Sequence, residues 1–138
     1  MSLSPDSAPR DETPVRDLRR LLREMQPHLR EGRYAFCAPS PGEPIPASAI
    51  GWFREAEGDS LILPLEEARA RGAAVVVELA LITLEVYSAI DAVGLTAAVS
   101  SALAADGIAC NVVAAVRHDH LFVPAERAAD ALRILSAL

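Results

Sequence analysis

The sequence contains no lysine, so each of its 13 basic side chains is an arginine. The 19 acidic residues outnumber them, which gives a formal net charge of −6, and the arginines are scattered along the chain. Proteins that bind nucleic acids need a clustered basic surface that neutralises phosphates. We therefore expect no nucleic-acid partner.

Cysteines and long uncharged apolar segments are also scarce. Cys37 and Cys110 are too few for a disulfide framework, and both lie in apolar runs, as buried thiols do in a reducing compartment. The longest apolar run, residues 73–87, carries Glu78 and Glu85 and is too short and too charged to cross a bilayer. The first residues show no signal-peptide pattern. We expect a cytoplasmic protein without a membrane partner.

Aromatic residues make up only 4% of the chain, whereas apolar residues make up 51%. The core must therefore be built from Val, Ile, Leu and Ala. A chain of 138 residues is long enough for one compact domain or for two very small interlocked ones.

Hydrophobic periodicity and turn residues predict a regular series of helices and strands after a polar, flexible tail at residues 1–13. Thr13 and Pro14 are typical of a helix start, and Pro27 is expected to end that helix near Gln26. The next predicted elements are strands at 33–38, 52–57 and 60–64, a proline-rich loop at 39–51, a tight turn at Gly58 and Asp59, a helix at 66–71, and a long strand at 73–87.

A third helix, which is rich in small residues, is predicted after a turn at residues 88–94. Asp91 or Ser88 is expected to cap it, its alanines to let it lie close to the sheet, and Gly107 to end it. The remaining predicted elements are a strand at 108–117, a turn at 118–120, a strand at 121–123, and a final helix opened by Pro124, with Ala128, Ala131, Leu132, Leu135 and Leu138 facing inward.

The order of these elements predicts the fold. The hairpin at 52–64, the helix at 66–71 and the start of the long strand precede residue 79, and a strand, a helix, two strands and a helix follow it. Both are rotated versions of the ferredoxin-like βαββαβ unit, the first without an opening strand and the second without a closing one. We predict an α+β fold with antiparallel sheets and helices on one face, in which an N-terminal half (residues 14–77) and a C-terminal half (residues 78–138) complete each other's sheets. Unpaired edges favour self-association.

The turn at residues 88–94 is the best candidate for a binding site. It delivers backbone N–H groups to a helix start, where unpaired amides and the helix dipole favour a carboxylate or another anion.

The stretch AVGLTAAVSSALAADGIACNVV, residues 92–113, resembles the ACT domain, a regulatory module of aspartokinases and other enzymes of amino-acid biosynthesis. The pieces FREAEGDSLIL, ITLEVYSAIDAVGLTAAVSSALA, GIACNVVAA and HDHLFVP look like a family of stand-alone bacterial ACT-like proteins. Together the pieces extend the likeness over residues 15–138. The link from Arg71 to the long strand is shorter than in that family, and residues 114–117 are less aromatic.

The resemblance implies an amino-acid effector that lies between the loop after the first strand and the next strand of a partner domain. Amides of residues 94–96 could receive an α-carboxylate, Asp91 could hold an α-ammonium, and Asn111 could bridge ligand and loop. Alternatives stay open: Gly94 could serve close packing, Asp91 could be a helix cap, and Asn111 a satisfied core residue. The ligand residues carried over by position are Ser88, Ala89, Asp91, Val93, Gly94, Leu95, Thr96 and Asn111.

The leading hypothesis is a non-enzymatic regulatory protein without a cofactor. It would bind an amino acid or a similar zwitterion and act allosterically through a homodimer interface. The alternative is a structural or partner-binding module with a vestigial ligand site.

A small enzyme or metal protein is a third hypothesis. His118 and His120 share a strand face, and Asp119 lies between them, but a metal needs three or four ligands and His28 is expected in a distant helix. A polar turn is therefore favoured for residues 118–120. A nucleophilic Cys37 or Cys110 is disfavoured, because apolar surroundings raise the pKa of a thiol. Glu55 and Glu57 could form a carboxylate pair on one strand face, but a solvated edge is favoured.

Overall fold

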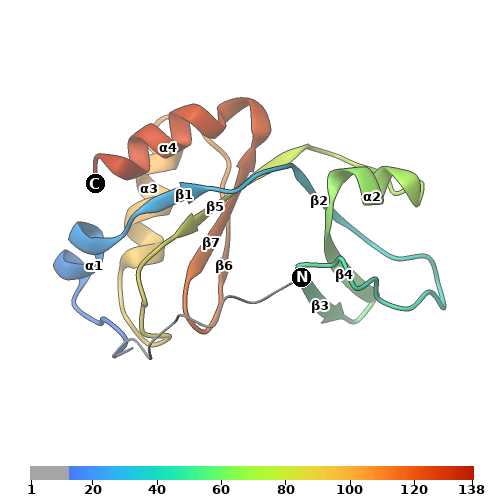
Figure 1. Cartoon of the computed structure of the whole chain (residues 1–138), viewed down its shortest axis with the longest axis horizontal. Helices are drawn as coiled ribbons and strands as arrows, with labels where there is room; N and C mark the ends of the chain where they lie inside the picture. The colour runs from blue at the N-terminus through green and yellow to red at the C-terminus, as the bar shows by residue number, and fades with distance from the viewer. Residues whose placement is uncertain (1–12) are drawn as a thin grey trace, which may run out of the picture.

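A computed structural model describes residues 13–138 of the chain, so the predicted tail, apart from Thr13, lies outside the described residues. Figure 1 shows α1, α3 and α4 gathered over β1, β5, β6 and β7, while α2 lies with β2, β3 and β4. None of the described helices is long and apolar enough to cross a membrane. The elements in chain order are α1 (Leu18–Glu24), β1 (Pro27–Leu29), β2 (Tyr34–Cys37), β3 (Gly51–Glu55), β4 (Gly58–Pro64), α2 (Leu65–Ala70), β5 (Leu79–Leu84), α3 (Leu95–Ala105), β6 (Asn111–Ala114), β7 (Asp119–Pro124), a 3-10 turn (Ala125–Arg127) and α4 (Ala128–Ser136).

The seven strands of the described residues form one antiparallel sheet. Six of them follow the order β3-β4-β2-β5-β7-β6, and the seventh, β1, pairs with β5. β1 and β2 follow each other along one side of β5: His28 pairs with Thr83 and Tyr34 pairs with Leu79, while β7 pairs along the other side. β5 is therefore both the closing strand of the first ferredoxin-like half and the opening strand of the second. The predicted α+β fold with two interlocked halves and helices on one face is confirmed.

The expectation that the first half lacks an opening strand is wrong, because β2 fills that position. What this half lacks is its first helix. The loop at residues 38–50, which holds four prolines, stands in its place. Proline fixes φ and has no N–H, which prevents a helix here. Ile45 and Ala49 of the loop pack against the buried cluster beneath α2, where a helix would otherwise lie.

All six residues of β5 are buried, as the prediction of a strand covered on both faces requires. Ile82 and Leu84 face the larger core, which α1, α3 and α4 cover. Leu81 faces the other side and packs with Phe122 of β7. The rings of Tyr34 and Phe36 meet Phe122 edge-on, with centroids 6.2 and 5.1 Å away. Phe122 therefore joins β2 of one half to β7 of the other.

The first helix starts later than predicted. It begins at Leu18, and the side chain of Asp17 caps it by accepting a hydrogen bond from the amide of Arg20 at 2.8 Å. Val15 instead pairs with the turn after β5, donating to the carbonyl of Tyr87 at 2.7 Å and accepting from the amide of Ala89 at 2.9 Å. These long-range backbone bonds replace the helical bonds that a local pattern predicts.

Pro27 ends α1 as predicted, but it also opens β1, which was not predicted. Proline is tolerated as the first residue of a strand. The predicted long strand at 73–87 shortens to β5. Just before β5, Glu78 forms ion pairs with Arg33 and Arg69.

Two predicted turns are displaced. The loop between β3 and β4 is Ala56 and Glu57, and Gly58 with a φ of 135° opens β4, because it pairs directly with Glu55. β6 ends at Ala114, and the loop to β7 is residues 115–118, closed by a bond from the amide of Ala115 to the carbonyl of His118 at 3.0 Å. Some side chains also differ from the prediction. Three alanines of the small-residue helix and Leu138, which were expected to face the sheet or the core, are exposed: Ala97, Ala104, Ala105 and Leu138.

Replacing Phe122 with alanine should lower the free energy of unfolding by about 3–5 kcal/mol, because it empties a buried site that joins the two halves. Phe53, which is 72% exposed on the edge strand β3, provides the matched control. Phe53→Ala should change stability by less than about 0.5 kcal/mol. Urea unfolding of both variants measures the difference, and equal effects would contradict the assigned role of Phe122.

Candidate functional site

A small cavity of about 110 Å³ lies at the corner where β5 turns towards α3. Residues 88–96 form most of its wall, the end of β6 closes one side through Ala114 and Ala115, and Asp119 enters from β7. The predicted binding turn therefore borders this cavity, and β7 completes the wall.

Gly94 shapes the start of α3. It is the N-terminal cap residue and has a φ of 107°, which side chains with a Cβ rarely adopt. A Cβ there would lie 2.9 Å from Cδ2 of Leu18 on α1. No side chain caps α3, contrary to the predicted caps at Ser88 and Asp91. The first amides of α3 thus lack the side-chain acceptor that usually satisfies one of them.

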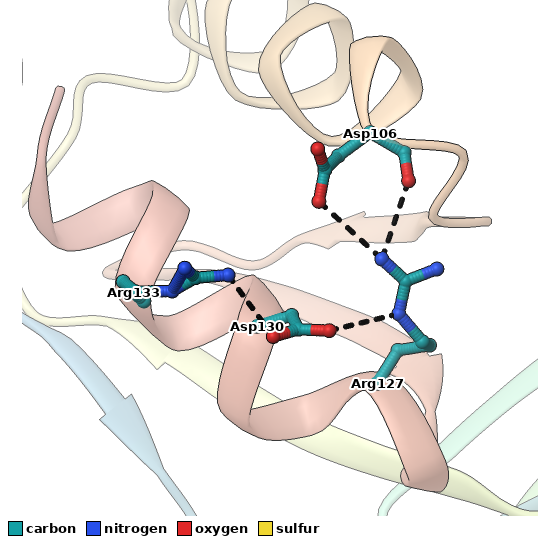
Figure 2. A network of polar contacts seen from close by, with 4 residues as sticks. All are labelled: Asp106, Arg127, Asp130 and Arg133. Carbon is teal, nitrogen blue, oxygen red and sulfur yellow. Dashed lines mark hydrogen bonds and ion pairs between the residues drawn. The ribbon is translucent and has the colours of Figure 1, made fainter.

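The far end of α3 is held by arginine. Figure 2 shows Arg127, at the start of α4, donating to the carbonyl of Asp106 at 3.2 Å and to its carboxylate at 3.3 Å. Asp130 accepts from Arg127 at 3.1 Å and from Arg133 at 3.0 Å. A cation at the carbonyl end of a helix complements the helix dipole. These contacts hold α3 with its amide end towards the cavity.

Asp119 is the most unusual group in the cavity wall. The residue is only 8% exposed, and no hydrogen bond or ion pair joins its carboxylate to another residue of 13–138, so its oxygens keep only their limited contact with solvent. Burial raises the pKa of this carboxyl, and the positive charges of His120 and His118 only partly offset the effect. A desolvated carboxylate without a partner is costly, and a cation beside it would remove that cost.

The structure brings five of the eight predicted ligand residues into the wall: Ser88, Ala89, Gly94, Leu95 and Thr96. The other three lie elsewhere. Asp91 is exposed and forms an ion pair with Arg16, and Val93 is 84% exposed on the rim. Asn111 is exposed at the opposite end of β6, where it pairs with Phe122. That these residues bind a ligand stays a prediction.

Sequence reasoning missed Asp119 as part of this site, because it placed residues 118–120 in a turn. The structure puts Asp119 and His120 in β7, where alternation turns neighbouring side chains to opposite faces. The available signal was an aspartate two residues before the apolar run at residues 121–123.

The metal hypothesis finds no ligand cluster: no group of three or more His, Cys, Asp or Glu residues in the described part of the chain could hold an ion. His28 is nevertheless closer to His120 than expected, because it lies in β1 and pairs with Thr83, which pairs with His120.

Burial raises the pKa of both Cys37 and Cys110, and the charge of Arg71 partly offsets this effect at Cys37.

The predicted carboxylate pair does not form on one strand. Glu55 ends β3 and Glu57 lies in the turn that follows, and both side chains are exposed, as expected of a solvated edge.

A larger hollow of about 560 Å³ lies under the loop at 38–50, at the end of β2. There Arg71 pairs with Glu67 at 3.2 Å and with Glu43 at 3.5 Å, so its charge is already balanced.

Comparison with known proteins places this geometry in context. Two family models of the ACT domain match the sequence, one over residues 13–79 and one over residues 76–137. A crystal structure from Vibrio cholerae, described as a protein of unknown function and possible transport protein, is 41% identical, with a TM-score of 0.72 over 85% of this chain and 91% of that one.

Two further structures share the fold. A protein from Agrobacterium tumefaciens is 23% identical, with a TM-score of 0.67 over 82% of this chain and 87% of that one. The regulatory subunit of aspartate kinase from Thermus flavus is 12% identical, with a TM-score of 0.56 over 81% and 95% of the two chains. No match was found among curated proteins.

Asp119→Asn should stabilise the protein at about pH 7, by on the order of 1 kcal/mol, because the buried charge disappears. The folded pKa is raised, so the penalty is present above that pKa and absent below the ordinary aspartate value of about 3.9. The gain should therefore vanish near about pH 4. Urea unfolding at both pH values tests this, with the exposed Asp91→Asn as control; a destabilised variant at neutral pH would contradict it.

Proposed function

Since the chain belongs to the ACT-domain family, we propose that it is a non-enzymatic regulatory protein that binds an amino acid or a similar zwitterion where two copies of the chain meet. One observation carries this proposal: the unpartnered carboxylate of Asp119 shares a small cavity with the uncapped start of α3. The carboxylate suits an ammonium group, and the helix amides suit a carboxylate. An α-amino acid presents both groups on one carbon.

The size of the cavity supports a shared site. A volume of about 110 Å³ equals that of roughly three or four water molecules and is below the roughly 300 Å³ at which ligand pockets begin. It can hold the ammonium and carboxylate groups but little more. Around it, Ile90, Val93 and Val116 expose aliphatic side chains to solvent. Exposed apolar side chains around a small polar cavity favour a second protein surface that completes it.

The edge strand β6 offers a specific way to build that surface. β6 has one free edge, since only β7 pairs with it in the described chain. If the β6 strands of two copies pair antiparallel about a two-fold axis at Val113, Val112 of the second copy comes opposite Ala114 of the first. Ala114 lines the cavity. We propose that the second copy completes the cavity in this way and that Asp91 and Val93 contribute at the rim. A ligand contact from Asn111 stays a prediction, because alternation along β6 turns this side chain to the face of Phe122.

Regulation would follow from the position of the ligand between two copies. A ligand at such a boundary shifts the arrangement of the copies by as much as it prefers one arrangement over the other. No further chemistry is required of the site.

Amino-acid binding is tested by thermal-shift and calorimetric titration with the common amino acids. We expect a saturable response that Asp119→Asn weakens by about tenfold or more, since it removes a charge-assisted bond to the ammonium group. Asp91→Asn should weaken it less. The reverse order would identify Asp91 as the ammonium partner, and no response to any amino acid would favour the alternative of a structural or partner-binding module.

Dimerisation through β6 is tested by Val113→Lys, which puts a charge on that edge. The variant should be monomeric by size-exclusion chromatography with light scattering and should lose the response to the amino acid. Phe53→Lys places the same charge on the other edge strand, β3, and should leave both the dimer and the response unchanged. A dimeric Val113→Lys variant, or a monomeric Phe53→Lys variant, would contradict this arrangement.

A further inference from the structure

A second hollow lies on the opposite side of the hairpin that carries Asp119. It has a volume of about 440 Å³, and its wall comes from the end of β1, the end of β5, the β6–β7 loop and β7. Strand alternation turns Asp119 towards the corner cavity and turns His120 to this other side. We call it the arginine–histidine hollow. The charged and polar residues of its wall are Arg30, Thr83, Glu85, Arg117, His118 and His120.

The histidine at its base is held in place. Oγ1 of Thr83 lies 3.0 Å from Nδ1 of His120, and the two residues are direct partners on neighbouring strands. Thr83 is almost fully buried, so its hydroxyl is a fixed partner. Because Nδ1 is engaged, Nε2 is the ring nitrogen left to meet a ligand in the hollow.

The hollow gathers basic side chains in an acidic protein. Burial lowers the pKa of His120, the charges of His118 and Arg30 lower it further, and Asp119 acts in the opposite direction. Arg117 lies over the ring of Tyr87, 5.6 Å from its centroid. Glu85 contributes the carboxylate among the described wall residues. Two guanidinium groups and two imidazoles therefore line the same hollow as the carboxylate of Glu85.

We propose that the arginine–histidine hollow binds the phosphate group of a small metabolite. A phosphate carries about −1.5 to −2 charges at neutral pH and three strongly accepting oxygens, so it can meet donors from several directions at once. Guanidinium forks match its oxygens. A carboxylate has one charge and two oxygens, so it can accept hydrogen bonds from fewer of these donors. The volume also admits part of the organic body of the ligand.

This proposal does not depend on the amino-acid site, which lies on the other side of β7. The test is calorimetric titration of the full chain with inorganic phosphate, against sodium chloride at the same ionic strength. We expect saturable binding to phosphate. Arg30→Gln and His120→Gln should each weaken it about tenfold, the usual effect of losing one bond to a charged group. Both variants should keep the wild-type circular dichroism spectrum.

The control is Arg23→Gln, which removes the same charge from the exposed surface of α1 and should leave phosphate binding unchanged. The proposal is overturned if phosphate binds no better than chloride, if Arg30→Gln binds like the wild type, or if Arg23→Gln weakens binding equally. Acetate that binds as tightly as phosphate would also overturn it. The amino-acid response of Arg30→Gln, which should be unchanged, separates this test from that of the corner site.

A pH series with sulfate isolates the histidines, because sulfate remains a dianion throughout. The groups that surround His120 are Arg30, Glu85, His118, Asp119 and, one residue pair away, His28. Protonated imidazole adds a charge and a donor, so sulfate should bind more tightly at about pH 6 than at about pH 8. His120→Gln should flatten this dependence. A flat profile in the wild type would remove the histidines from the proposed site.

Discussion

The structure depends on the complete burial of β5. This strand closes one ferredoxin-like half and opens the other, so its two edges and both faces are occupied by elements from distant parts of the chain. Helices cover one face, and Phe122 with the rings of β2 covers part of the other. Neither half can keep a complete sheet without it. The candidate corner site lies directly after this strand, and its position is therefore fixed by the best-packed element of the fold.

The sequence pattern correctly predicted those elements that depend on interactions between residues close together in the chain. The small-residue helix, the proline-rich loop and the alternation of helices and strands followed from periodicity and from the properties of proline and glycine. The errors lie where distant backbone groups decide. Val15 pairs with the turn at Ser88 instead of starting α1, and β1 exists because it pairs with β5. The corner turn could be located from sequence, but Asp119 could not, because only the hairpin register brings it there.

The polar groups of β7 show how one short strand can serve two chemistries. Asp119 turns a carboxylate towards the cavity beside α3, and His120 turns an imidazole towards the opposite side of the sheet. Burial disfavours the charged form of both groups. The charges of His118 and Arg30 add to this effect at His120, whereas the charges of His120 and His118 partly offset it at Asp119. Such groups gain most when an oppositely charged molecule arrives, because binding then replaces lost hydration.

The proline loop that replaces the first helix makes the two halves unequal as receptors. A repeated fold would ordinarily offer two equivalent corners, one after each opening strand. Here only the corner after β5 is followed by a helix, while the corner after β2 opens onto a segment without aligned peptide dipoles. Under the proposed function, only one of these two corners would recognise a carboxylate with a helix start, and a two-fold assembly would carry two effector molecules instead of four. In that proposal the loop at residues 38–50 sets the number of effector molecules.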